Sequence, residues 1–175
     1  MYKKGLSSVV ATTLIVLLTV TAAIIIAGYV IPLVENNLKE GTECFEYKDY
    51  FYFEEDFGYN CYNDSLYAIS VGANFQEPRI RKGIKGFRLA FTKSDESNAI
   101  NVEEGQLKTG EIRMLNSSIN NLIIPKSGEV RTYVYQSPME FQSVKIYPLL
   151  KSGRVCDEND FIKIDHLCRG TLEII

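Results

Sequence analysis

The residues of this chain that are best suited to chemistry are few and widely spaced. His166 is the only histidine, and it has no nearby serine in a nucleophile-elbow sequence. Asp157 and Asp160 could offer oxygen ligands to a hard cation, but their segment lacks the glycine and the final glutamate of a twelve-residue calcium loop. A solvated turn is therefore the favoured interpretation at residues 157–160. The sequence predicts no catalytic residue, no metal and no cofactor, and we expect a protein that is not an enzyme.

Cysteine is the remaining reactive residue type, and the chain has Cys44, Cys61, Cys156 and Cys168. They form two local pairs, neither with the CxxC spacing of a zinc or redox motif, and His166 alone could add an imidazole ligand. We therefore predict disulfides Cys44 to Cys61 and Cys156 to Cys168, although spacing does not prove connectivity. Disulfides indicate an oxidising, extracytoplasmic location.

The element that must hold these residues outside the cell is a long apolar run at the start of the chain. Residues 6–34 contain no charged side chain. As a helix this run would extend about 43 Å, more than the roughly 30 Å of a bilayer's hydrocarbon core. Lys3 and Lys4 precede the run and Glu35 follows it, so the positive-inside rule places the N-terminus in the cytoplasm.

A cleaved secretory signal peptide explains this run less well. Its apolar region would span about 7 to 15 residues before a small-x-small cleavage site. Here the small residues Ala22, Ala23, Ala27 and Gly28 have apolar residues on both sides. A plain uncleaved membrane anchor remains an alternative.

The residues around Gly5 suggest a different maturation. Lys3, Lys4 and Gly5 stand directly before Leu6 and the sequence SSVVAT, which continues into the uncharged run. This arrangement resembles the class III signal peptide of type IV pilin-like proteins, particularly archaeal pilins and archaellins. Bacterial pilins usually carry glutamate at the fifth mature position, where this chain has Val10, so the resemblance favours the archaeal type.

The resemblance implies a processing route and a set of partners. A prepilin peptidase would cut after Gly5 on the cytoplasmic side, so that Leu6 becomes the first residue. The apolar helix would lie in the cytoplasmic membrane before assembly and then pack against copies of itself in a helical surface filament. Small residues and threonines along the run would allow such close helix packing.

Beyond the apolar run, the hydrophobic pattern changes to the alternation of half-buried strands. Tyr67, Ile69 and Val71 share one face, as do Phe87 and Leu89. The strands that this alternation predicts are residues 45–53, 66–75, 84–93, 107–115, 119–124, 129–136, 142–150 and 170–175. We expect an α+β chain with a leader at 1–5, a hydrophobic helix at 6–41 and an immunoglobulin-like β-sandwich head at 42–175. External sandwich heads are also what the family resemblance implies.

Two surface features of the head have a functional interpretation. The segment CFEYKDYFYFEEDFGYNC is rich in aromatic and acidic residues, which would either enter the core or form an adhesive or subunit interface. Asn63 and Asn116 begin Asn-x-Ser tripeptides, so we expect both to be glycosylation sites on an external domain.

Net charge narrows the range of partners. The chain carries −3, and the part after the apolar run carries −5 because Lys3 and Lys4 are the only charges before Glu35. Such an acidic balance argues against a nucleic-acid partner, which would require clustered Lys and Arg. The resemblance around Gly5, taken together with this balance, implies a structural subunit of an archaeal type IV pilus-like filament at the cell surface. The alternative is an uncleaved membrane-anchored extracellular binding module with an Ig-like domain.

Overall fold

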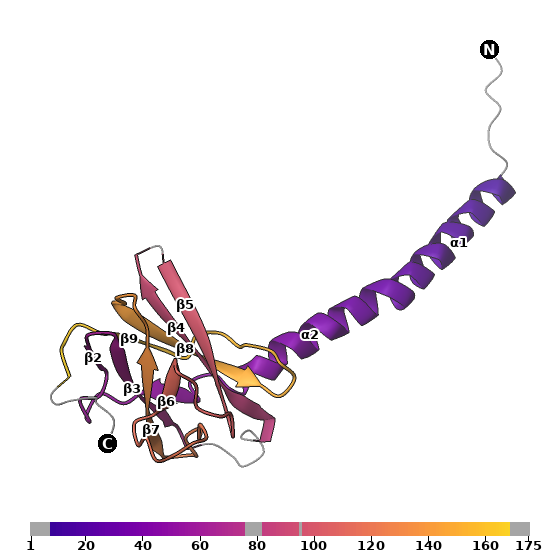
Figure 1. Ribbon diagram of the computed structural model, residues 1–175. Coiled ribbons are helices and arrows are strands. Elements are labelled where there is room, and N and C mark those ends of the chain that lie inside the picture. Colours follow the sequence, from indigo (N-terminus) through magenta and orange to yellow (C-terminus); the bar gives the residue numbers. More distant parts are fainter. Residues whose placement is uncertain (1–7, 76–81, 95, 169–175) are drawn as a thin grey trace. The chain divides into compact units, whose positions relative to one another are not determined.

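The computed structural model describes residues 8–75, 82–94 and 96–168. The chain divides into two compact units, Met1–Phe45 and Glu46–Ile175. The first unit is helical and the second contains all of the described strands (Figure 1). The predicted α+β class, a hydrophobic helix followed by a β-sandwich, is confirmed.

The helical unit is one continuous rod with a local change of pitch. It comprises α1 (Ser8–Ile25), the π-helix η1 (Ile26–Val30) and α2 (Ile31–Phe45). Pro32 explains the π segment, because proline has no N–H to donate and its ring crowds the carbonyl four residues earlier. The wider turn lets the N–H of Ile31 donate to the carbonyl of Ile26. The helix continues through Gly41 to Phe45, four residues beyond the end predicted from its Asn and Gly residues.

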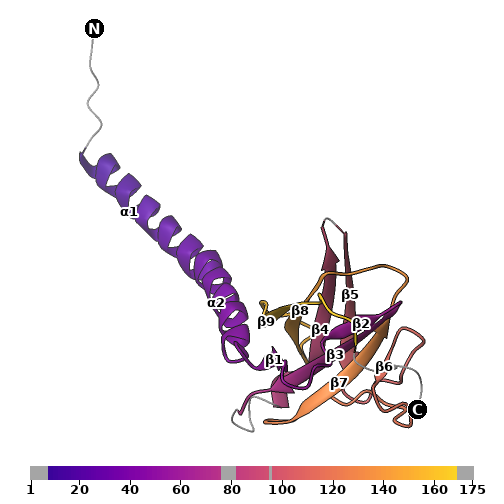
Figure 2. The same cartoon turned by 90° about the vertical axis from the view of Figure 1, so that its left-hand side faces the viewer.

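The head consists of two antiparallel sheets that face each other (Figure 2). The first sheet has the order β1-β3-β7-β6, with β2 pairing to β3 beside β1, and the second has the order β5-β4-β8-β9. This matches the A-B-E-D and C′-C-F-G orders of an immunoglobulin-like sandwich, which confirms that prediction. The strand bounds are β1 (Phe51–Phe53), β2 (Cys61–Asn63), β3 (Leu66–Ala73), β4 (Ile84–Lys93), β5 (Glu96–Glu103), β6 (Ile112–Met114), β7 (Val130–Gln136), β8 (Ser143–Leu150) and β9 (Asp160–Lys163).

Aromatic side chains fill the space between the two sheets. Phe91 of β4 stacks on Tyr135 of β7 with ring centroids 4.3 Å apart, and Phe87 meets Tyr133 edge to face at 5.3 Å. Phe51 of β1 contacts Phe87 at 5.1 Å. Such pairs contribute roughly 0.5–1.5 kcal/mol each beyond the burial of their surface. The core therefore depends on the inward faces of the central strands, where alternation was clearest in the sequence.

The predicted strands divide according to their position in the sheets. Four predictions are confirmed within two residues at either end: 66–75, 84–93, 129–136 and 142–150. Residues 107–115 contain only the short strand β6, and 119–124 form no strand, although Leu122 and Ile124 are buried and so produced an alternating pattern. The prediction for 170–175 lies outside the described residues.

The prediction of a strand at 45–53 is largely wrong. The helix includes Phe45, a turn follows in which Asp49 has a φ of 57°, and only Phe51–Phe53 is extended. Tyr50 and Phe51 are both buried, and Tyr50 lies just before the strand begins. Four of the eight aromatics of this segment, Tyr47, Tyr50, Phe51 and Phe53, enter the core as the first interpretation held, whereas Phe45, Phe57 and Tyr59 are exposed.

Candidate membrane helix and disulfide-linked head

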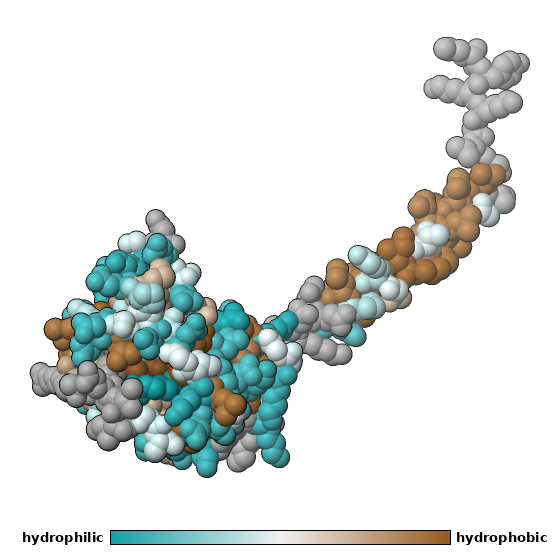
Figure 3. Space-filling view, viewed as in Figure 1, coloured by the Kyte–Doolittle hydropathy of each residue, from teal (hydrophilic) through white to brown (hydrophobic). Residues whose placement is uncertain are grey.

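The apolar helix is the largest functional feature of the first unit. The helix formed by residues Val10–Glu35 is long and apolar enough to cross a membrane, and none of its apolar segment is buried within the protein. Figure 3 shows apolar side chains covering α1. At 1.5 Å per residue these 26 residues extend about 39 Å, which exceeds the hydrocarbon thickness of about 30 Å. This surface requires lipid or protein around it, because water would leave it unfavourably exposed.

Hydroxyl groups of threonines in this helix form hydrogen bonds within the helix itself, so they do not need water as a partner. The hydroxyl of Thr13 donates to the carbonyl of Val10 at 3.0 Å, and that of Thr19 to Val16 at 2.9 Å. Thr21 donates to Leu17 at 2.9 Å. Each donor is thus satisfied within the helix, which removes most of the cost of transferring a hydroxyl into an apolar medium.

The predicted processing residues precede the part of the chain that the structure describes. Lys3, Lys4, Gly5 and Leu6 lie outside the described residues, which begin at Ser8. Cleavage after Gly5 therefore stays a prediction from the sequence.

The cysteine pairing predicted from the sequence is wrong. Cys61 of β2 bonds to Cys168, 107 residues away, and not to Cys44. Cys44 and Cys156 are also disulfide-bonded, and none of the four cysteines is free. The extracytoplasmic character inferred from disulfides is retained, but the local pairs are replaced by a link across most of the head.

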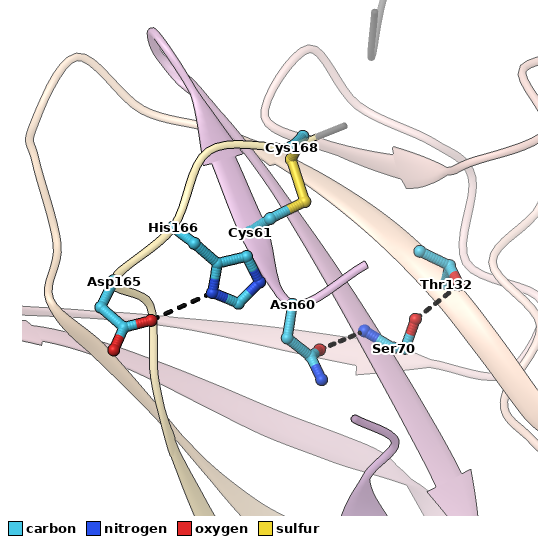
Figure 4. The surroundings of a disulfide bond; sticks show 7 residues. All are labelled: Asn60, Cys61, Ser70, Thr132, Asp165, His166 and Cys168. Carbon is cyan, nitrogen blue, oxygen red and sulfur yellow. Dashed lines mark hydrogen bonds and ion pairs between the residues drawn. A yellow bond between two sulfur atoms is a disulfide. The ribbon is translucent and has the colours of Figure 1, made fainter. Parts of the chain in front are cut away.

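Strand pairing explains why Cys168 reaches Cys61. The segment that ends at Cys168 runs parallel to β2, with Tyr62 opposite Leu167. The N–H of Tyr62 donates to the carbonyl of His166 at 3.2 Å, and the N–H of Cys168 donates to the carbonyl of Tyr62 at 3.0 Å. The disulfide therefore fixes the end of the described chain to the edge strand β2 (Figure 4). Nothing in the sequence indicated that Cys168 lies beside Cys61, because 107 residues separate the two.

Beside the disulfide, the side chain of Asn60 supplies a hydrogen bond at a point where the outer edge of β3 has no neighbouring strand. The outer edge of β3 is covered by β2 as far as Ala68 and by β1 from Val71 onward. Between them, the N–H of Ser70 donates to Oδ1 of Asn60 at 2.8 Å, and its carbonyl accepts from Glu54 at 2.9 Å. Asn60 is only 2% exposed, and its Nδ2 donates to the carbonyl of Glu54 at 2.7 Å.

Figure 4 shows the hydrogen bond from Ser70 to Asn60 beside the hydroxyl pair of Ser70 and Thr132. Sequence analysis missed Asn60, whose only signal was its place directly before Cys61.

His166 and Asp165 lie on the surface near Asn60. Nδ1 of His166 is 3.0 Å from Oδ1 of Asp165, and this hydrogen bond holds the pKa of the Asp165 carboxyl below its usual value. A hollow of about 320 Å³ beside them is also lined by Glu55, Gly58 and Phe161. Within the described part of the chain no group of three or more His, Cys, Asp or Glu residues could hold a metal ion.

The acidic residues within 157–160 make different contacts. Oδ2 of Asp160 accepts the backbone N–H of Phe53 at 2.7 Å, and Oδ1 accepts that of Phe161 at 2.8 Å. Glu158 pairs with Lys145 at 2.8 Å, whereas Asp157 is exposed. Asp160 thus joins β9 to the edge strand β1 across the two sheets, a role that the sequence did not suggest.

The two sequons differ in their surroundings. Asn116 is exposed in a loop, and its Oδ1 accepts hydrogen bonds from the N–H of Ser118 at 3.1 Å and from its hydroxyl at 2.6 Å. Asn63 is half-buried at the end of β2, before the turn in which Asp64 has a φ of 51°. Asn116 is therefore the more accessible of the two predicted glycosylation sites.

Comparisons with known proteins add no family to this description. No protein-family model, no curated protein and no solved structure matches the chain.

Proposed function

We propose that this chain is a structural subunit of an archaeal type IV pilus-like surface filament, without enzymatic activity. In this proposal a prepilin peptidase cuts after Gly5, and the helix that begins near Leu6 joins copies of the chain into a filament. The sandwich head stays outside the cell. The proposal combines the resemblance around Lys3, Lys4 and Gly5 with the architecture of the described residues.

The observation that carries the proposal is the unburied apolar helix on a disulfide-bonded head. A membrane anchor needs about 20 apolar residues, and this helix offers 26. The surplus suits a helix that is also buried by neighbouring copies. Hydrogen bonds within the helix satisfy the hydroxyls of Thr13, Thr19 and Thr21, so a lipid or a protein environment would serve equally well.

Leader removal has a physical reason in this scheme. Lys3 and Lys4 hold the end of the helix in the cytoplasm during insertion. The same two charges would be costly if that end were buried among apolar helices in a filament. Cleavage after Gly5 removes both at once, and glycine lets the backbone extend into a protease cleft.

The test is the N-terminus of the protein recovered from its native cell surface, by intact mass and N-terminal sequencing. We expect the wild type to begin at Leu6 and the variant Gly5→Leu to retain Met1. The matched control is Gly110→Leu, because a Cβ atom added at Gly110 meets no atom within 4 Å. That control should be cleaved and assembled as the wild type is.

An uncleaved wild-type chain on the cell surface would overturn the proposal. It would instead support the membrane-anchored extracellular binding module. Cleavage without filaments in electron micrographs would reject the filament function and leave only the processing step.

A further inference from the structure

The outer strand of the second sheet has an edge that no described strand covers. β5 pairs with β4 through eight consecutive residue pairs, from Lys93–Glu96 to Gly86–Glu103, without a bulge. It stands at the end of the order β5-β4-β8-β9. The other described edge strands, β1, β2, β6 and β9, have only three or four residues each.

The ladder shows which backbone groups of β5 face outward. Glu104 donates its N–H to the carbonyl of Lys85 at 3.1 Å, on the side of β4. Because direction alternates along an antiparallel strand, Ile100 and Val102 also face β4, whereas Ala99, Asn101 and Glu103 face away. The N–H of Glu103 is covered by Oε1 of Gln106 at 3.1 Å. The open part of the edge is therefore residues 97–101.

This open edge lacks the usual protection against strand pairing. Natural edge strands are shielded by proline, lysine, a bulge or a covering group. β5 contains neither proline nor lysine, and Ser97 and Ala99 are exposed. The edge strand β1 differs, since the carboxylate of Asp160 covers the N–H of Phe53.

Two copies of β5 are complementary when placed antiparallel about a twofold axis at Ile100. Ala99 then lies opposite the partner's Asn101 as a hydrogen-bonded pair, and Ile100 lies opposite the partner's Ile100. The half-buried Ile100 side chain gains an apolar neighbour in this register. The partner's Ser97 lies opposite Glu103, whose charge is already paired with Lys85 at 2.8 Å.

Repulsion limits how far the two β5 strands can pair, and a hollow beside the edge can accommodate the partner's side chains. Glu96 would face the partner's Glu104, and the N–H and carbonyl of Glu103 are already bonded to Gln106, so we expect the hydrogen-bonded pairing to be confined to Ala99 and Asn101 of each copy. The Glu104 carboxylate accepts the N–H of Ile124 at 2.9 Å. A hollow of about 670 Å³ runs along the edge and leaves space for the partner's side chains; it is lined by Ala99 and Ile100 and by the polar residues Arg88, Asn101, Glu103, Gln106, Thr109 and Glu111.

From these observations we propose that the open edge of β5 is a self-association surface, at which the heads of two copies join β5 to β5. The second sheet then continues from one molecule into the next. The isologous contact closes on itself, so it joins copies in pairs. It does not depend on cleavage after Gly5 or on helix assembly.

The test is a disulfide between two Ile100→Cys chains, made with the full-length protein in detergent under mild oxidation. Opposed residues of a non-hydrogen-bonded pair have Cα atoms about 4.5 Å apart, within the range for a disulfide. The added thiol is the only free one, because all four native cysteines are bonded. We expect a covalent dimer linked through the two introduced thiols, confirmed by peptide mapping, and at least tenfold less dimer from the control Asn120→Cys.

A second substitution tests the strand pairing itself. Ala99→Pro removes an outward N–H without removing a hydrogen bond to β4, and Ala99→Lys adds an edge charge if proline impairs folding. Either, added to Ile100→Cys, should reduce the covalent dimer at least tenfold while the melting temperature stays close to that of the Ile100→Cys chain. Equal dimer yields with and without these changes, no dimer at any concentration, or linkage to another protein instead would each overturn the proposal.

Discussion

At the scale of single residues, the head uses side chains to complete its sheets where strands are missing. Asn60 and Asp160 each accept a backbone N–H that has no strand beside it, from Ser70 and from Phe53 respectively. A buried N–H without a partner costs roughly 1–3 kcal/mol, so these two side chains have structural importance out of proportion to their number.

Replacing Asn60 with alanine tests this role. We expect the free energy of unfolding to fall by about 1–3 kcal/mol, because the buried N–H of Ser70 loses its acceptor and the carbonyl of Glu54 loses a donor. Urea unfolding measures the change. Asn120→Ala, at an exposed residue, is the control and should stay within about 0.5 kcal/mol of the wild type. Equal effects of the two substitutions would contradict the proposed role of Asn60.

At the scale of elements, the helix and the sandwich separate two tasks. The strands of the head bury their aromatic faces against each other, whereas none of the helix from Val10 to Glu35 is buried within the chain. The helix surface is therefore available for lipid or for other copies. The π segment before Pro32 keeps this rod continuous to Phe45, where the head begins.

A charge in the helix should impair assembly without unfolding the head. Ile24 is 65% exposed on the apolar rod, and a lysine near the centre of a membrane helix costs about 2.5–3.5 kcal/mol. We expect Ile24→Lys to abolish filaments in electron micrographs while near-ultraviolet circular dichroism of the head stays unchanged.

The control places the same charge on the other unit. Leu107→Lys alters a similarly exposed apolar residue of the head and should leave filaments intact. Normal filaments from Ile24→Lys, or loss of filaments from both variants, would count against packing through this helix.

At the scale of the whole molecule, the Cys61–Cys168 disulfide joins distant parts of the chain. Cys61 and Cys168 close a loop of 107 residues, which in the chain-entropy model stabilises the fold by about 4.7 kcal/mol. The predicted local pairing would have closed much shorter loops. The observed link fixes the end of the described chain to β2, which contributes only three residues to its sheet.

Single cysteine substitutions distinguish the two pairings. In Cys61→Ser we expect Cys168 to become the one cysteine labelled by a maleimide after denaturation, identified by peptide mass. The apparent free energy of unfolding should fall by up to about 4–5 kcal/mol, since the loop is no longer closed. Labelling of Cys44 instead would show that the local pairing exists in solution.

By itself, the sequence determined the elements whose pattern reflects burial or composition. The uncharged run required a helix in an apolar environment, and alternation in segments such as 84–93 required strands with one buried face. Those strands are central in their sheets, so the pattern and the packing agree. The Ig-like sandwich was predictable for the same reason.

Only the tertiary structure decided which distant residues meet. β5 was missed because the first half of its sequence ESNAINVE is exposed and only Ile100 and Val102 alternate as apolar residues, too short a pattern to indicate a strand. The partner of Cys61, and the roles of Asn60 and Asp160, depend on strands that are neighbours in space but far apart in the chain. Local patterns carry information about burial, whereas these contacts arise from the order in which the sandwich places its strands.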